Sequence, residues 1–206
     1  MDRLYDDINE AKAFALSFTN FAYFYDDWEN SDSYSVICEH CRKEIQYADY
    51  MMPKSSAKKD TSILHSLQFG VSPELRDELI SRFDITESDF RPIRTKRGET
   101  VYYQITPQHK MLPLHEENEW PVMSHCTQCG NIRYDRPRRE NQKGEPYYYI
   151  AQDVLEEMHD LNVTHEGFGR FDYPLYVISR RVYDYLTECY PRTHYFPFFL
   201  KGDVAE

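Results

Sequence analysis

Hydrophobic and polar residues alternate along this chain in short blocks, a pattern that favours a mixed α and β fold over a helical bundle. Residues 6–18 place apolar side chains on one helical stripe and predict a helix, the stripe being Ile8, Ala11, Phe14, Ala15 and Phe18. The aromatic block 21–28 predicts a strand, followed by an acidic turn over 26–32. Two further short blocks, 34–37 and 44–47, predict strands on either side of the six residues 38–43.

The middle of the chain contains one well-marked helix start. Ser72 is a good N-cap, Pro73 suits the first helical position, and Glu74 places an acid in the first turn. The buried side of this helix should be Leu75, Leu79, Ile80 and Phe83. Strands should follow at 90–93 and 101–105, and Gly98 should interrupt the regular structure between them. Loops are predicted over 53–61, 113–121 and 135–146, with a short strand at 132–134.

The C-terminal third has the firmest pattern. A strand at 147–150 and a short helix at 151–159 precede an apolar strand at 175–178. Ser179 then caps a helix that carries Val182, Leu186 and Cys189 on its apolar face, where a buried cysteine is expected. Pro191 ends this helix, and 195–200 is a final strand. The order predicts a β-α-β unit within 147–200.

Four of the five cysteines form two Cys-x-x-Cys pairs, Cys38/Cys41 and Cys126/Cys129. Two such pairs match a tetrahedral zinc site, and each pair lies between strand-like blocks rather than at a helix start, which disfavours a redox role. The 84 residues between Cys41 and Cys126 exceed the about 15–20 of an ordinary zinc ribbon. Either one split ribbon carries a large insertion, or the pairs are two unrelated half-sites. His40 or His125, each next to a cysteine, could replace one ligand.

A four-cysteine site has a structural rather than a catalytic role, because four thiolates leave no position for water on the Zn²⁺ ion. The chain also lacks the HExxH, GxSxG, P-loop and dinucleotide-binding patterns. Glu156 and His159 have the spacing of half a di-iron motif, but the second half is missing, so an exposed helix face is the simpler interpretation. The sequence therefore predicts a binding protein and not an enzyme.

Composition and charge restrict the partner. The chain has 206 residues, 16% of them aromatic, and a formal net charge of −11. Nucleic acid repels such a surface, and a basic protein would be attracted to it, although solubility alone also explains an acidic balance. The acidic N-terminus lacks the apolar core of a signal peptide, and no run is long enough to span a bilayer. We expect a cytoplasmic protein with no membrane partner and reduced thiols, which suit metal binding.

The order of these features resembles a known family. A first knuckle, meaning a turn that carries one Cys-x-x-Cys pair, is followed by an insertion with a capped helix at 72–83 and a strand that ends at Ile105-Thr106-Pro107. A second knuckle ends with Cys129-Gly130. After it come Phe171-Asp172-Tyr173-Pro174-Leu175 and a closing strand, serine, helix and strand. This looks like the double-CXXCG motif proteins, immunity proteins of bacterial polymorphic toxin systems. Arg42 departs from the motif, which has glycine after the first pair.

The resemblance implies an immunity protein that binds and neutralises a cognate toxin, with the four cysteines as ligands of a structural Zn²⁺. An acidic protein of this kind suits a basic toxin. Aromatic residues among acids are plausible interface anchors. The candidate partner-binding residues lie in two stretches: Asp26, Asp27, Trp28, Glu29 and Asp32, and Glu116, Glu117, Glu119 and Trp120. The alternative is a zinc-ribbon protein that binds nucleic acid or acts in transcription.

The expected fold is a single α+β domain over 1–206, built on a split zinc ribbon. Its halves should occupy about 34–48 and 122–135, on either side of a helix-containing insertion at 49–121. The β-α-β unit at 147–200 completes the expected chain.

Overall fold

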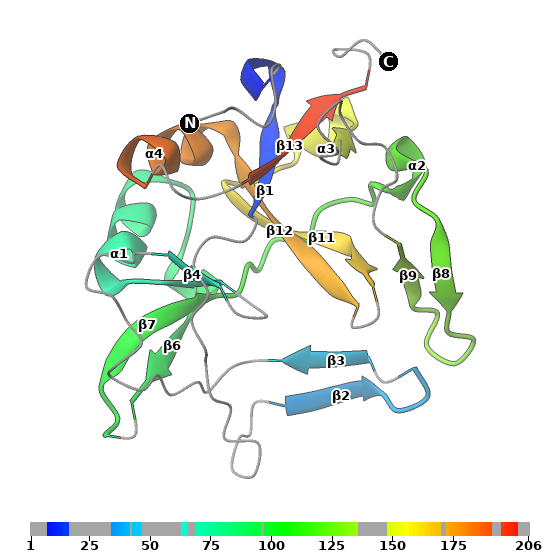
Figure 1. The fold of residues 1–206 in the computed structure, drawn as a ribbon, viewed down its shortest axis with the longest axis horizontal. Helices are drawn as coiled ribbons and strands as arrows, with labels where there is room; N and C mark the ends of the chain where they lie inside the picture. Colours follow the sequence, from blue (N-terminus) through cyan, green and yellow to red (C-terminus); the bar gives the residue numbers. More distant parts are fainter. Residues whose placement is uncertain are drawn as a thin grey trace. The chain divides into compact units, whose positions relative to one another are not determined.

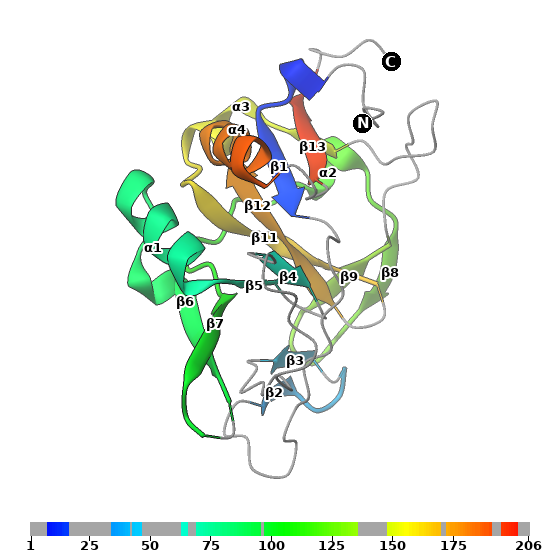
Figure 2. The ribbon, with the colours of Figure 1, turned by 60° about the vertical axis from the view of Figure 1, so that its left-hand side comes forward.

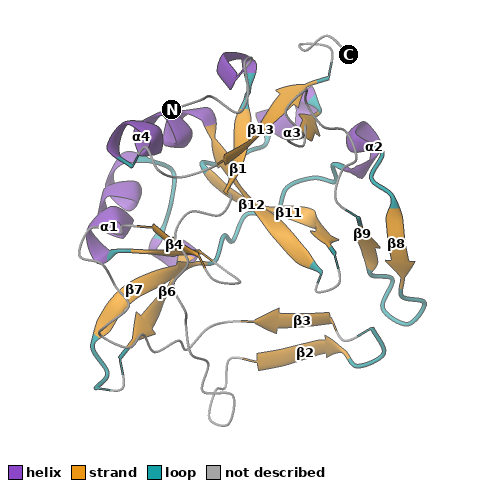
Figure 3. Ribbon diagram, in the orientation of Figure 1, coloured by secondary structure: helices purple, strands orange, loops and turns teal. Residues whose placement is uncertain are grey.

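The computed structural model describes residues 8–16, 34–41, 43–46, 63–65, 69–95, 97–135, 148–169, 172–190 and 195–201. The fold is α+β, and strands make up most of the regular structure (Figures 1 and 3). The chain separates into two compact units, one formed by Met1–Ser17 with His109–Glu206 and the other by Phe18–Gln108. The expectation of a single domain stays a prediction.

The first unit is organised around a seven-stranded sheet of order β10-β13-β1-β12-β11-β9-β8. Its elements are η1 (Ile8–Glu10), β1 (Ala13–Leu16), α2 (His115–Asn118), β8 (Val122–His125), β9 (Ile132–Tyr134), β10 (Tyr148–Ile150), α3 (Gln152–Glu156), β11 (Leu161–Phe168), β12 (Tyr173–Ser179), α4 (Arg180–Cys189) and β13 (Tyr195–Leu200).

The last two strands of this unit, β12 and β13, are not neighbours in the sheet, because β1 lies between them. β1 pairs antiparallel with β12 on one side and with β13 on the other, so β12 and β13 run parallel with β1 between them. α4 connects these two strands and packs on β1 and β12 (Figure 2). The strand, serine, helix and strand predicted for the end of the chain are confirmed, and the N-terminal segment is inserted into their sheet.

The helix predicted over 6–18 is wrong in its described part, because 13–16 form β1, an interior strand of the sheet. All four of its residues are buried, and successive side chains in a strand face opposite sides of the sheet. Phe14 stacks on Tyr183 of α4 with ring centroids 3.5 Å apart, while Ala13 and Ala15 belong to the core of the other face. A strand that is buried on both faces has a continuous run of apolar residues. Because such a short run also fits the apolar stripe of a helix, the hydrophobic pattern could not distinguish the two.

The predicted cap of α4 is confirmed. The Ser179 hydroxyl accepts a hydrogen bond from the backbone N–H of Val182 at 3.4 Å, and Val182 and Leu186 are buried. Cys189 corrects the prediction, because it is exposed at the last helical position and not packed on the apolar face.

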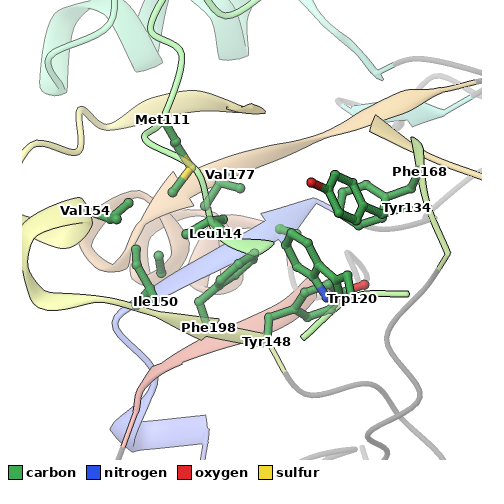
Figure 4. Close-up of a cluster of buried hydrophobic side chains, with 12 residues drawn as sticks. Met111, Leu114, Trp120, Tyr134, Tyr148, Ile150, Val154, Phe168, Val177 and Phe198 are labelled. Atoms are coloured by element: carbon green, nitrogen blue, oxygen red, sulfur yellow. The ribbon is translucent and has the colours of Figure 1, made fainter. Parts of the chain in front are cut away.

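The other face of the sheet carries an aromatic core (Figure 4). Its buried members are Ala13, Ala15, Met111, Leu114, Trp120, Tyr134, Tyr148, Ile150, Val154, Phe168, Val177 and Phe198. The Trp120 ring meets Phe168 edge to face at a centroid distance of 4.7 Å, a favoured aromatic geometry. The segment before β8 and the short helix α3 therefore both contribute to burying this face.

Two elements of this unit differ from the sequence expectation. The loop predicted over 113–121 contains α2, and β11, the longest strand, has no counterpart among the predicted elements. Three polar residues of β11 are buried, namely Asn162, Thr164 and Glu166. Each is hydrogen-bonded inside the fold; for example, Asn162 Nδ2 donates to the Val177 carbonyl at 3.1 Å. Buried polar residues break the apolar pattern by which a strand is recognised.

The second unit contains two sheets, β2-β3 and β4-β5-β7-β6, and the helix α1. Its elements are β2 (Tyr34–Cys38), β3 (Lys43–Gln46), β4 (Ile63–His65), β5 (Phe69–Val71), α1 (Pro73–Arg82), η2 (Glu87–Asp89), β6 (Phe90–Arg94) and β7 (Thr100–Ile105). The predicted N-cap is confirmed: the Ser72 hydroxyl accepts from the Leu75 N–H at 3.2 Å. The strands predicted at 90–93 and 101–105 are also confirmed, and Gly98 between them adopts a φ of 83°.

Candidate metal centre

The second cysteine pair occupies the turn of the β8–β9 hairpin. Cys126 follows the last residue of β8, and its N–H donates to the Asn131 carbonyl at 2.8 Å. The Gly130 N–H donates back to the Cys126 carbonyl at 2.8 Å, and Gly130 has a φ of 72°, a conformation that favours glycine. The backbone thus folds tightly around the two thiols, as the Cys-x-x-Cys-Gly pattern requires.

The first pair occupies the corresponding place in the β2–β3 hairpin. Cys38 is the last residue of β2 and lies opposite Lys43 of β3, and Cys41 closes the turn between the two strands. Arg42, which stands where the second knuckle has glycine, is outside the described residues, so its effect on the knuckle stays a prediction.

The structure brings all four predicted ligands together. The thiol sulfur atoms of Cys38, Cys41, Cys126 and Cys129 all lie within 4.8 Å of one another. A tetrahedral zinc site with Zn–S bonds of about 2.3 Å places its sulfur atoms roughly 3.8 Å apart, so this group is close to the required size. Cys38 and Cys126 are buried, with 6% of each residue exposed, whereas Cys129 is exposed.

The donor set is made of thiols alone. His40 and His125 are exposed and are not members of the four-residue group. Within the described ranges, this is the one group of three or more histidine, cysteine or acidic side chains with the proximity needed for a metal ion. Glu156 and His159 of the half di-iron pattern are both exposed and belong to no such group there.

Two residues that the sequence analysis did not select as site residues, Asn131 and Asp172, support the second knuckle through a side-chain hydrogen bond. Asn131, which follows Cys129-Gly130, donates from Nδ2 to Asp172 Oδ2 at 2.7 Å. Asp172 stands just before β12, is buried, and has a φ of 57°. The position of Asn131 directly after the Cys-x-x-Cys-Gly motif was the available signal, because residues next to metal ligands often fix the ligand backbone.

Gly167 makes room for this contact. A Cβ atom on Gly167 would lie 2.0 Å from Asp172 Oδ1 and 2.7 Å from the Asp172 carbonyl oxygen, closer than packed atoms approach. The Gly169 N–H also donates to the Tyr134 carbonyl at 2.9 Å, which ties the β11–β12 turn to β9. The second knuckle is therefore mounted on the β11–β12 hairpin through side-chain and backbone contacts.

The candidate partner-binding residues differ in whether the structure describes them and in how exposed they are. Asp26, Asp27, Trp28, Glu29 and Asp32 lie outside the described residues. Glu116 and Glu119 are exposed, and Glu117 is half-buried, at or just after α2. Trp120 is only 4% exposed and lies among Tyr134, Tyr148 and Phe168 (Figure 4). The structure thus places Trp120 in the core and not on a surface, because its large ring fills the aromatic cluster.

A buried carboxylate fixes the start of α2. Glu166 Oε1 accepts hydrogen bonds from the N–H groups of Leu114 at 2.6 Å and His115 at 3.0 Å, and lies 3.2 Å from His115 Nδ1. Burial, and to a lesser extent the charge of Glu166, raises the pKa of Tyr134 above its usual value. Glu166 therefore holds the short acidic segment at a defined place on the sheet.

Comparison with protein-family models, curated proteins and solved structures gave no match for this chain. Among the described helices, none has both the length and the apolar character needed to cross a bilayer.

Proposed function

We propose that this chain is an immunity protein that binds a cognate bacterial toxin and carries a structural zinc ion. The observation that carries the proposal is the convergence of four thiols from two hairpin turns, in the order expected for double-CXXCG immunity proteins. The zinc assignment rests on ligand number, ligand type and sulfur spacing. The binding role rests on the resemblance and on the net charge of −11.

The proposed metal centre is a split zinc ribbon. Each half is an antiparallel hairpin whose turn contributes two thiolates, and the segment from Arg42 to His125 separates the halves. Four thiolates would fill the coordination sphere of Zn²⁺, so the ion would stabilise the fold and would not activate water. We therefore assign no catalytic role to the metal and propose a protein that acts by binding.

A strongly acidic chain favours a basic partner over nucleic acid. Opposite net charge accelerates encounter between two proteins and contributes to the choice of partner. A basic toxin domain, such as a nuclease, would be attracted to this chain, and an immunity protein neutralises its toxin by covering the active site. A nucleic-acid-binding zinc ribbon is expected to carry a basic face instead.

The metal is tested by elemental analysis of the purified protein, for which we expect about one zinc per chain. Cys126→Ser should lower that content and destabilise the protein, whereas Cys189→Ser, an exposed thiol outside the group, should leave both unchanged. A folded protein that contains no zinc after purification in zinc-supplemented medium would overturn the metal assignment.

The binding role is tested with the polypeptide encoded beside this chain's gene, purified as an inactive variant. We expect a one-to-one complex and protection of cells that express the active toxin. A gel-shift assay with DNA and RNA at low salt, where electrostatic binding is strongest, should show no complex. Salt-sensitive nucleic-acid binding without any complex with the neighbouring polypeptide would favour the zinc-ribbon alternative.

A further inference from the structure

The two edge strands of the seven-stranded sheet, β10 and β8, differ in whether their outer backbone groups are covered. At one edge, the strand β10 is buried along its whole length. The side chain of Asn118, the last residue of α2, bonds both backbone groups of Tyr149: Oδ1 accepts from the N–H at 2.7 Å and Nδ2 donates to the C=O at 2.8 Å. An asparagine amide thus occupies the place where a neighbouring strand would pair with β10.

The opposite edge is β8, and in the described part of the chain no strand pairs with its outer side. All four residues of β8 are exposed, and Val122 and Met123 expose 59% and 53% of their surface. These two residues leave apolar surface open at this edge of the sheet. Ile132 on β9, which lies opposite His125, adds a further partly exposed apolar side chain.

An open edge strand is a template for pairing, because alternate backbone N–H and C=O groups point away from the sheet. Soluble proteins usually block such edges with lysine, proline or a covering element. β8 itself contains neither lysine nor proline. It has one irregularity, a register shift between Val122 and Ser124, which limits regular pairing to a short segment.

The chemistry beside β8 indicates the kind of strand that would pair there. The chain leading into it carries exposed Glu116 and Glu119, which belong to the same unit as β8 and precede it by a few residues. No lysine or arginine lies between His115 and His125, and the nearest such residue in the sheet is Arg133 of β9, the inner neighbour of β8, opposite Ser124. An apolar strand edge with acids at its entrance is complementary to an extended segment that combines apolar and basic side chains.

We infer that β8 is the docking edge for the partner, and that an extended, apolar and basic segment of the toxin adds to the sheet beside it. This inference rests on the proposed immunity function and specifies its binding surface. Main-chain hydrogen bonds to β8 would supply affinity, Val122 and Met123 would supply apolar contact, and Glu116 would attract basic side chains. Asn118 blocks the other edge, which restricts strand addition to β8.

The test uses the full chain and the inactive polypeptide from the neighbouring gene. Met123→Lys and Val122→Lys place charge on the open edge and should weaken binding roughly tenfold or more, on the scale of an interface hot spot. Leu112→Lys is the matched control, because Leu112 is an exposed apolar residue outside β8. Glu116→Lys should slow association in a salt-dependent way, whereas Glu99→Lys in the β6–β7 turn should not. Circular dichroism and zinc content confirm that each variant is folded.

Hydrogen exchange gives a second readout that does not depend on substitutions. We expect the amides of β8 to become protected in the complex, while those of β10 do not change. If the wild-type chain binds the toxin but β8 stays unprotected and both lysine variants bind normally, the docking edge is overturned and the immunity function stands. If the wild-type chain does not bind, the proposed function fails and this inference fails with it. Protection of β8 in a homodimer, measured without toxin, would identify a second copy as the occupant and overturn the inference.

Discussion

The second cysteine knuckle belongs to a hairpin that is part of a seven-stranded sheet, whereas the first belongs to a hairpin that forms a two-stranded sheet. β9 pairs with β11, and Asn131 contacts Asp172 beneath the second turn. In the described part of the chain, β2 and β3 pair only with each other. Two paired strands contribute little stability by themselves in water, so strand pairing supports the two occurrences of the motif unequally.

This difference predicts how the proposed metal site would form. The Asn131–Asp172 contact and the pairing of β9 with β11 support the turn that carries Cys126 and Cys129, so we expect this turn to keep its place without an ion. Cys38 and Cys41 belong instead to a hairpin whose two strands, in the described residues, pair only with each other. The metal should therefore act mainly on the first hairpin, which it would fix to ligands already in place.

Metal removal should have the largest effect and should separate the two hairpins. On the analogy of a disulfide that closes a loop of similar length, losing the link costs roughly 4–5 kcal/mol of unfolding free energy. After chelation, amides of 34–46 should exchange almost as fast as in an unstructured peptide, while those of β8 and β9 should stay partly protected. Hydrogen exchange with mass spectrometry measures both in one sample.

The cysteine variants provide the matched controls for this comparison. Cys38→Ser and Cys126→Ser should give the same exchange pattern as chelation, and Cys189→Ser should give the wild-type pattern. An equal loss of protection in both hairpins would show that the scaffold does not position the second knuckle.

Gly167→Ala should have the next largest effect and act on the second knuckle alone. The new methyl group would collide with Asp172, and overpacking of this kind costs about 1–3 kcal/mol. Chemical denaturation measures the loss. Combining Gly167→Ala with Asp172→Gly removes the clash with the carboxylate, so the two changes should be less destabilising together than their sum. Strict additivity would contradict the proposed packing.

Asp172→Ala should have a smaller effect, because it removes the acceptor for Asn131 without adding bulk. We expect about 1.5 kcal/mol of lost stability, the lower end of the range for a hydrogen bond to a charged group. Zinc affinity should fall about tenfold, as is common when a residue supporting the ligands is lost. A competition titration with a zinc indicator measures it. Asp172→Asn retains an acceptor oxygen and tolerates the positive φ, and it should keep most of the affinity.

The sequence predicted the features that depend on local chemistry. The caps at Ser72 and Ser179 are such features, because each serine hydroxyl and the backbone N–H that it accepts from are only three residues apart. The four thiols were also predictable, because the ligand type and the Cys-x-x-Cys spacing are both visible in the chain. In each case the residues that decide the local structure are close together in the sequence. The exception is the contact between the two cysteine pairs, which are far apart in the sequence.

The features that the sequence did not predict depend on distant partners. β1 is a strand because β12 and β13, more than 150 residues away, pair with both of its edges. Glu166 looks like a surface residue until its contacts with the N–H groups of Leu114 and His115 are known. Trp120, next to three exposed or half-buried glutamates, looks like a surface anchor, but its ring fills the core formed with Tyr134 and Phe168.

The smallest predicted effect concerns Tyr134, which anchors the end of the second hairpin in this core. Its pKa is raised above the ordinary value of 10.0, first by burial and second by the charge of Glu166. The neutral phenol is thus favoured in the folded state, so its stabilising contribution is complete below the unfolded pKa and is lost as the pH rises through the folded pKa. Unfolding free energy should therefore fall with pH above about 10, and Tyr134→Phe should make this fall shallower.

Tyr102→Phe is the matched variant in the other unit, since burial and then Glu74 raise the pKa of Tyr102 in the same direction. It should also reduce the alkaline slope, but the amides of β9 should retain their normal pH dependence of exchange. In the wild type, protection of β9 should decline at alkaline pH as Tyr134 ionises. If Tyr134→Phe and the wild type lose protection of β9 in parallel as the pH rises, ionisation of this residue does not control the anchor of the second hairpin.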